Sequence, residues 1–189
     1  MCLDFINTLD DRFSGEPNEL LKTYIDLARF GEDTLILPTE QVDRLFTRSQ
    51  ESPDLAQRAL QSAKRLREAM SEIFYAVARR KPVPRGAVIL LNGFVQEAAQ
   101  HASLTPARRH FEWEFDSAAS DFDAPLWPIA RSAADLLASD QLQLVRACAS
   151  KTCEWLFLDT SKAHKRRWCD MTKCGNRAKA RRHYSRQSS

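Results

Sequence analysis

The sequence predicts a mainly α-helical protein: an N-terminal helical domain with one minor strand element, followed by a small C-terminal module built around four cysteines. Three observations predict this class. Apolar residues recur at helical spacing through most of the first 143 residues, one short stretch alternates instead, and four of the five cysteines follow residue 147. The composition, 43% hydrophobic and 28% charged, is typical of a globular protein and not of a disordered chain.

Three segments before residue 81 have the apolar periodicity of helices. Residues 17–30, opened by Pro17, and residues 38–49 each carry one apolar stripe. The longest segment begins at Ser52, a residue type that caps helices, with Pro53 at the first helical position. Its apolar residues recur mostly in steps of three or four, which predicts one buried face. That face consists of Leu55, Ala59, Ala63, Leu66, Met70, Ile73, Phe74 and Val77.

Three further elements complete the predicted N-terminal domain. Residues 87–103 are predicted to be helical, and residues 123–139 form another helix with Asp123 as its cap. Between them, residues 108–116 alternate aromatic and charged side chains, which predicts a half-buried strand. The change in charge and cysteine density near residues 143–147 divides the chain into a helical domain, 1–143, and a module, 144–189.

A polar pair near the N-terminus has two interpretations. Asn7 and Thr8 lie between apolar residues, where they would cap a helix or satisfy a buried turn. The alternative is that Asn7 lines a ligand pocket together with Arg131, which shares a helix face with Trp127. Packing is the favoured interpretation, and Asn7 and Arg131 remain the candidate pocket residues.

Charge is distributed unevenly along the chain. From Arg146 to Ser189 there are twelve Lys and Arg against three acids, a net charge of +9, whereas residues 1–145 carry a net charge of −6. An acidic body with a strongly basic end predicts a separate role for that end.

The spacing of the C-terminal cysteines predicts a metal site. Cys148 and Cys153 are separated by four residues, as are Cys169 and Cys174, and fifteen residues connect the two pairs. Four thiolates in two short knuckles are a typical structural Zn²⁺ site. The alternatives are two disulfides, an iron centre, or structural cysteines without a metal. Neither pair has the C-x-x-C spacing of thiol oxidoreductases.

The connecting segment predicts a small zinc ribbon. Residues 155–159 are β-prone, 160–164 form a turn, and 165–169 return as a second strand. Gly175 directly follows the last cysteine, where it would allow a positive φ or a close backbone approach. So short a module buries little surface, and the metal would therefore supply much of its stability.

These residues resemble a known family. "CGNR" at 174–177, with "FLD" at 157–159 and "RRWC" at 166–169, resembles the CGNR zinc finger family, and "LDFINT" at 3–8 is similar to the start of the ABATE-type domain that precedes such fingers. The resemblance spans nearly the whole chain. It implies that Cys148, Cys153, Cys169 and Cys174 bind zinc, in agreement with the spacing, and it implies a DNA-binding role in stress-related transcription regulation.

A basic surface follows from the same module. We expect Asn176 to cap a short helix over 177–187. With the connecting segment, this helix presents basic side chains suited to phosphate contacts and, for Arg, to guanine. The candidate nucleic-acid-binding residues are Lys162, Lys165, Arg166, Arg167, Arg177, Lys179, Arg181 and Arg182. The alternatives are a solvated basic tail, or cations that neutralise the thiolate site.

We expect a DNA-binding regulator whose helical domain senses a small-molecule ligand or forms a homodimer. An RNA-binding module is the alternative, with Trp155, Trp168 and Tyr184 as stacking residues. We expect no enzyme, because the sequence shows no nucleophile–base pair, phosphate loop or open three-ligand zinc site. No apolar run approaches the ~20 residues of a membrane span, and no secretory signal is evident. We therefore expect a cytoplasmic protein with reduced thiols and no membrane partner.

Overall fold

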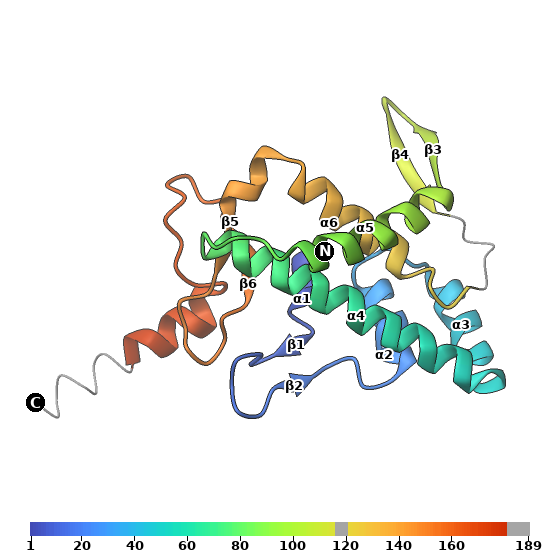
Figure 1. The fold of residues 1–189 in the computed structure, drawn as a ribbon, viewed down its shortest axis with the longest axis horizontal. Coiled ribbons are helices and arrows are strands. Elements are labelled where there is room, and N and C mark those ends of the chain that lie inside the picture. Colours follow the sequence, from blue (N-terminus) through green and yellow to red (C-terminus); the bar gives the residue numbers. More distant parts are fainter. Residues whose placement is uncertain (116–120, 181–189) are drawn as a thin grey trace, which may run out of the picture.

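The computed structural model describes residues 1–115 and 121–180, which form a bundle of helices with three separate two-stranded ribbons (Figure 1). The helices are α1 (Cys2–Ile6), α2 (Tyr24–Asp33), α3 (Thr39–Glu51), α4 (Pro53–Ala78), α5 (Arg85–Gln100) and α6 (Leu126–Leu137). The antiparallel ribbons pair β1 (Leu9–Asp10) with β2 (Asn18–Glu19), β3 (Ala102–Ala107) with β4 (His110–Phe115), and β5 (Val145–Ala147) with β6 (Leu156–Leu158). A 3₁₀ turn, η1 (Asp140–Leu144), and a π-helical turn, η2 (Met171–Gly175), complete the described chain, and residues 176–180 continue η2 as α-helix.

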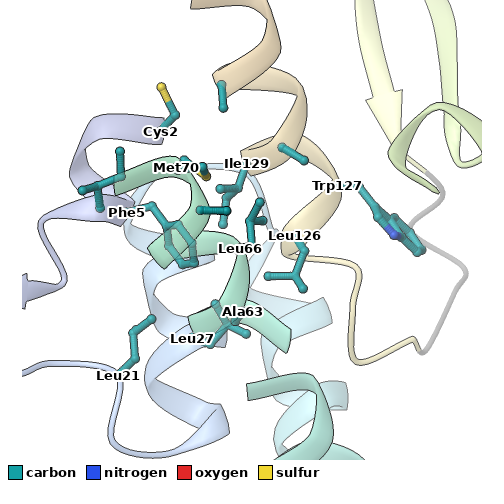
Figure 2. Packing of buried hydrophobic residues seen from close by; sticks show 14 of the residues in the cluster. Cys2, Phe5, Leu21, Leu27, Ala63, Leu66, Met70, Leu126, Trp127 and Ile129 are labelled. Atoms are coloured by element: carbon teal, nitrogen blue, oxygen red, sulfur yellow. The ribbon is translucent and has the colours of Figure 1, made fainter. Parts of the chain in front are cut away.

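Helix α4 is the centre of the core. Figure 2 shows its side chains Ala63, Leu66 and Met70 gathered with Phe5 of α1 and Ile129 of α6, all fully or almost fully buried. The predicted buried face is confirmed from Ala59 to Phe74, whereas Val77 in the last turn is half-buried. Leu55, in the first turn, is an exception, since it is 44% exposed.

The helix predicted from Pro17 begins later, at Tyr24. Thr23 starts α2 with a capping box, in which the Asp26 carboxylate accepts the Thr23 backbone N–H at 2.7 Å. The preceding residues are held out of the helix because Glu19 of β2 accepts two hydrogen bonds, of 2.6 and 2.7 Å, from the buried Arg67 guanidinium. This ion pair lowers the pKa of Glu19 despite the opposing effect of burial.

Two later predictions also need correction. The strand predicted over 108–116 exists as β4, but it is exposed instead of half-buried, and its partner β3 takes residues that were predicted as the end of a helix. Asp123 does not cap α6; the cap position is Pro125. Within residues 1–115 and 121–180, no helix has the length and apolar character needed to cross a bilayer.

The C-terminal hairpin packs into the helical core. Val145 of β5 and Leu156 of β6 are 1% exposed and belong to the same apolar cluster as α4. Three polar contacts reinforce this joint. The Trp155 indole N–H donates to the Asp10 carboxylate at 2.6 Å, the Tyr75 hydroxyl donates to the Glu154 carbonyl at 2.9 Å, and Asn7 binds the backbone of Leu156.

Asn7 acts as a substitute strand partner for Leu156. Its side-chain amide donates to the Leu156 carbonyl at 2.9 Å, and its side-chain oxygen accepts the Leu156 N–H at 3.0 Å, both in the buried interior. Asn7 therefore has the packing role that was favoured from the sequence. Its bonds to Leu156 are buried contacts across the domain boundary predicted near residue 143.

Replacing Asn7 with Ala removes the side chain that pairs both buried backbone groups of Leu156. We expect Asn7→Ala to lower the free energy of unfolding by about 2–4 kcal/mol in urea denaturation. Asn92→Ala, an exposed asparagine of α5, is the matched control and should change stability by less than about 0.5 kcal/mol. Equal, small effects of both substitutions would contradict the role given to Asn7.

Candidate metal centre and basic surface

The four C-terminal cysteines converge on one point. Their Sγ atoms all lie within 4.8 Å of one another, with 3.6 Å between Cys153 and Cys169 and 3.8 Å between Cys169 and Cys174. Four ligands at about 2.3 Å from a tetrahedral Zn²⁺ are about 3.8 Å apart. All five cysteines are free thiols, so the disulfide alternative does not describe this structure. The donor set and its spacing fit a four-thiolate metal site.

The first knuckle is a tight turn at the end of β5. The Cys148 N–H donates to the Trp155 carbonyl at 2.8 Å, which extends the β5–β6 ladder by one residue. The Ser150 carbonyl accepts the N–H groups of Cys153 and Glu154, each at 3.0 Å, and Glu154 adopts φ 53°. This left-handed residue returns the chain to β6 and leaves both sulfurs on one side of the turn.

The second knuckle is a capped helical turn. Asp170 is its cap, and its carboxylate accepts the N–H groups of Thr172 at 2.6 Å and Lys173 at 3.1 Å. The helix therefore begins with η2 at Met171, six residues earlier than a cap at Asn176 predicts, and Cys174 lies within its first turns. These N–H donors hold the pKa of Asp170 below its usual range, with the Thr172 hydroxyl making the largest contribution.

Gly175 is in close contact with the side chain of Met171, and its backbone angle is an ordinary one. No glycine in the described chain has positive φ, but a Cβ at this position would lie 2.4 Å from the Met171 sulfur. Of the two roles that the sequence predicts for this residue, the structure shows the close contact.

The connection between the knuckles is held by side chains and not by a second strand. Residues 165–169 form no strand, so this prediction was wrong; β6 pairs with β5 instead. The Asp159 carboxylate organises the loop by accepting the Ser161 N–H and hydroxyl and the Arg166 N–H. The Ser161 hydroxyl is the main reason that the pKa of Asp159 lies below its usual range. Arg167 then connects the knuckles, since its carbonyl accepts the Ala149 N–H at 2.8 Å.

The thiols compete electrostatically for ionisation. Burial raises the pKa of Cys169 to about 12 and also raises the pKa of Cys153. Burial also acts against ionisation of Cys148, but backbone N–H groups of Cys169 and Ser150 outweigh it and lower the Cys148 pKa. Neighbouring thiolates disfavour one another, and a divalent cation removes that penalty by replacing the protons.

The predicted basic residues divide into two groups. Arg166 donates to the Trp168 carbonyl at 2.8 Å and to the Cys169 carbonyl, and Arg177 reaches the Thr152 hydroxyl at 3.4 Å. These two arginines support the knuckles. The remaining described residues of the set are exposed, and in the described part of the chain they form no ion pair: Lys162, Lys165, Arg167 and Lys179. Arg181 and Arg182 lie outside the described residues.

Asn7 and Arg131 are not assembled into one site by the contacts they make. Asn7 is committed to the backbone of Leu156. Arg131 is on α6, where it donates to Asp135 at 2.7 Å and lies 4.0 Å from the centre of the Trp113 ring. The residues that sequence reasoning missed are Asp159 and Asp170; the pattern Asp-x-Ser/Thr, present at both positions, is a local turn and cap signal.

A ligand substitution separates the metal site from the fifth cysteine. We expect purified protein to hold one equivalent of zinc per chain, and Cys174→Ser to lose most of it, because three thiolates bind far more weakly than four. Cys2→Ala removes a buried thiol that lies outside the cluster and should leave the zinc content unchanged. Elemental analysis measures both; undiminished zinc in Cys174→Ser, or iron in place of zinc, would contradict the assignment.

Two family profiles match the chain in succession. The ABATE family, described as "putative stress-induced transcription regulator", matches residues 1–140, and the CGNR zinc finger family matches residues 145–187. No curated protein sequence matches the chain. The matched finger contains all four clustered cysteines, which accounts for the geometry described above. The chain thus belongs to the ABATE family and carries a C-terminal CGNR zinc finger.

Proposed function

We propose that this protein is a DNA-binding transcription regulator in which structural zinc orients a basic surface. The observation that carries the proposal is the division of the basic residues: Arg166 and Arg177 hold the knuckles, and this leaves Lys162, Lys165, Arg167 and Lys179 exposed and without ion pairs in the described chain. The family description supports the same role.

The charge of the module exceeds what its metal site needs. Zn²⁺ with four thiolates has a net charge of −2, and nearby cations neutralise part of it. The net +9 of residues 146–189 leaves a large excess, which suits a polyanion. Phosphate contacts through Lys and Arg position a protein on DNA, and an Arg side chain adds base recognition.

The contacts made by two tryptophans favour duplex DNA over single-stranded RNA as the partner. Trp155 donates its N–H to Asp10 and is half-buried against the helical domain, and Trp168 packs against the cysteine cluster. Both are engaged in structure and not arranged as a stacking platform for bases. Tyr184, the third predicted stacking residue, lies outside the described residues.

We also propose that the zinc is purely structural, that the protein is not an enzyme, and that it acts in the cytoplasm. Four protein ligands leave no open coordination position for a substrate. A reducing compartment keeps the thiols available to the metal.

Salt dependence tests the DNA proposal. Replacing Lys162, Lys165 and Lys179 together with Ala should weaken duplex binding at least tenfold and lower the slope of log affinity against log salt by about 0.9 for each lost phosphate contact. Lys22, Arg44 and Lys81, exposed residues of the helical domain, provide a matched triple-Ala control with unchanged affinity. Affinity that does not depend on salt, or equal effects of both triple variants, would overturn the proposal.

A second role, ligand sensing, is supported by a cavity in the helical domain. A space of about 240 Å³ lies between α5 and the start of α6, with Leu90, Phe94 and Leu126 in its apolar wall and Glu97 and Asp123 at its edge. In the described chain, one Asp123 carboxylate oxygen and the Trp127 indole N–H are buried without a hydrogen-bond partner. Burial, then the negative charges of Asp121 and Glu97, raise the pKa of Asp123. A bound cation would offset this negative charge and could donate to the unpaired Asp123 oxygen. We propose a small organic cation with an apolar body as the ligand.

Substitutions at Gly93 test the cavity without disturbing the packing of the helices. A Cβ at this position meets no atom within 4 Å, so Gly93→Ala should leave the cavity open, whereas Gly93→Leu should fill it. We expect phenethylammonium to bind wild type and Gly93→Ala with similar affinity, and to bind Gly93→Leu at least tenfold more weakly. The neutral analogue 2-phenylethanol should bind wild type at least tenfold more weakly than phenethylammonium does. Amide chemical shifts measure these affinities; no saturable shifts in wild type, or equal shifts in all proteins, would refute the site.

A further inference from the structure

The β3–β4 ribbon is the part of the helical domain with the least support from its surroundings. It extends beyond the helices in Figure 1, and among residues 1–115 and 121–180 its sheet contains these two strands alone. Five of the six residues of β4 are exposed. A two-stranded ribbon is marginally stable in water unless a third strand or another surface covers it.

One face of the ribbon is apolar. Leu104 lies opposite Trp113, and Pro106 lies opposite Phe111, whereas the other face pairs Ser103 and Thr105 with glutamates. Arg131 covers part of the Trp113 ring at 4.0 Å. Among the described residues, no side chain is recorded over Phe111 as Arg131 is over Trp113. Leu104 is 56% exposed and Phe111 is 66% exposed.

The two edges of the ribbon differ in their capacity to pair. Pro106 has no backbone N–H, so the outer edge of β3 lacks a donor at this position. Because Pro106 cannot donate across the ribbon, we assign the pair Pro106–Phe111 to the non-hydrogen-bonded pairs of the ladder. The Ser103 hydroxyl donates to the Glu114 carbonyl at 3.5 Å, so the backbone carbonyl of Glu114 points toward β3. Backbone groups of successive residues point to alternate edges of a strand, so the N–H and C=O groups of Phe111 and Trp113 point away from β3. The β4 edge is therefore the one open to another strand.

Charge along this edge is ordered so that the strand complements itself. Arg108 and Arg109 lie at the tip, Phe111 in the middle, and Glu112 and Glu114 beyond it. In an antiparallel copy centred on Phe111, Phe111 lies opposite its own copy and His110 lies opposite Glu112. Arg108 and Arg109 form the turn just beyond the end of β4, and this turn then lies at the end of the pairing near Glu114 of the other strand. A parallel copy would set like charges together.

We propose that β4 is the dimerisation edge of this protein, pairing in antiparallel fashion with β4 of a second copy about a two-fold axis at Phe111. The two ribbons then form one four-stranded sheet without β4 edges, and the exposed Phe111 side chains cover each other. Such an isologous contact is the commonest way in which soluble chains associate. The inference does not depend on DNA binding, since it is carried by the helical domain alone.

A charge exchange tests this pairing in the full-length chain. Arg108→Glu and Glu114→Arg, each alone, bring like charges close together at both ends of the pairing, and each should raise the dimer dissociation constant about tenfold. The double variant Arg108→Glu with Glu114→Arg restores the opposite-charge pairs and should return to within about threefold of wild type. Arg44→Glu, on α3, is the matched control with no effect on association.

Sedimentation equilibrium without DNA measures these constants, and circular dichroism confirms folding of each variant. Recovery of dimerisation in the double variant would establish the pairing. A wild type that stays monomeric throughout, or a double variant as weak as the two single variants, would overturn it. Neither result bears on DNA affinity, which the lysine variants test separately.

Discussion

The convergence of four sulfur atoms on one point is the constraint on which the C-terminal structure depends. Neither knuckle is held by an extensive apolar core of its own: one is a turn closed by the Ser150 carbonyl, and the other is a single capped turn at Asp170. The buried residues around them are essentially the cysteines and Phe157. Without a cation, four clustered thiols cannot all ionise. The two knuckles are then joined by little more than the hydrogen bonds from Ala149 to Arg167 and from Arg177 to Thr152.

The half of the module that includes β5 and β6 has a different source of order. It is fixed to the helical domain by Val145 and Leu156 in the core and by the two buried hydrogen bonds of Asn7. The first knuckle is therefore positioned by the helices, and the second is positioned by the metal. This division explains how two family segments that meet near residue 140 form a continuous interior.

Local patterns predicted the elements that depend on local chemistry. The cysteine spacing identified the four clustered sulfurs, and the three- and four-residue steps after Ser52 identified the buried face of α4. Predictions were wrong where a residue distant in the sequence determines the start of a helix or the pairing of a strand. Arg67 holds Glu19 in β2 and delays α2, and β6 pairs with β5, so the strand that was predicted over 165–169 has no partner. Alternation identified β4 as a strand, but it could not show that Phe111 is left exposed by the described helices, because alternation depends on the strand itself and not on its neighbours.

One metal ion bound by four thiolates orders the basic surface. Zinc-edge X-ray absorption of the purified protein measures the ligands of that ion. We expect a first shell of four sulfur atoms at about 2.3 Å, with no nitrogen or oxygen ligand. A shell that contains nitrogen or oxygen, or fewer than four sulfurs, would contradict the account.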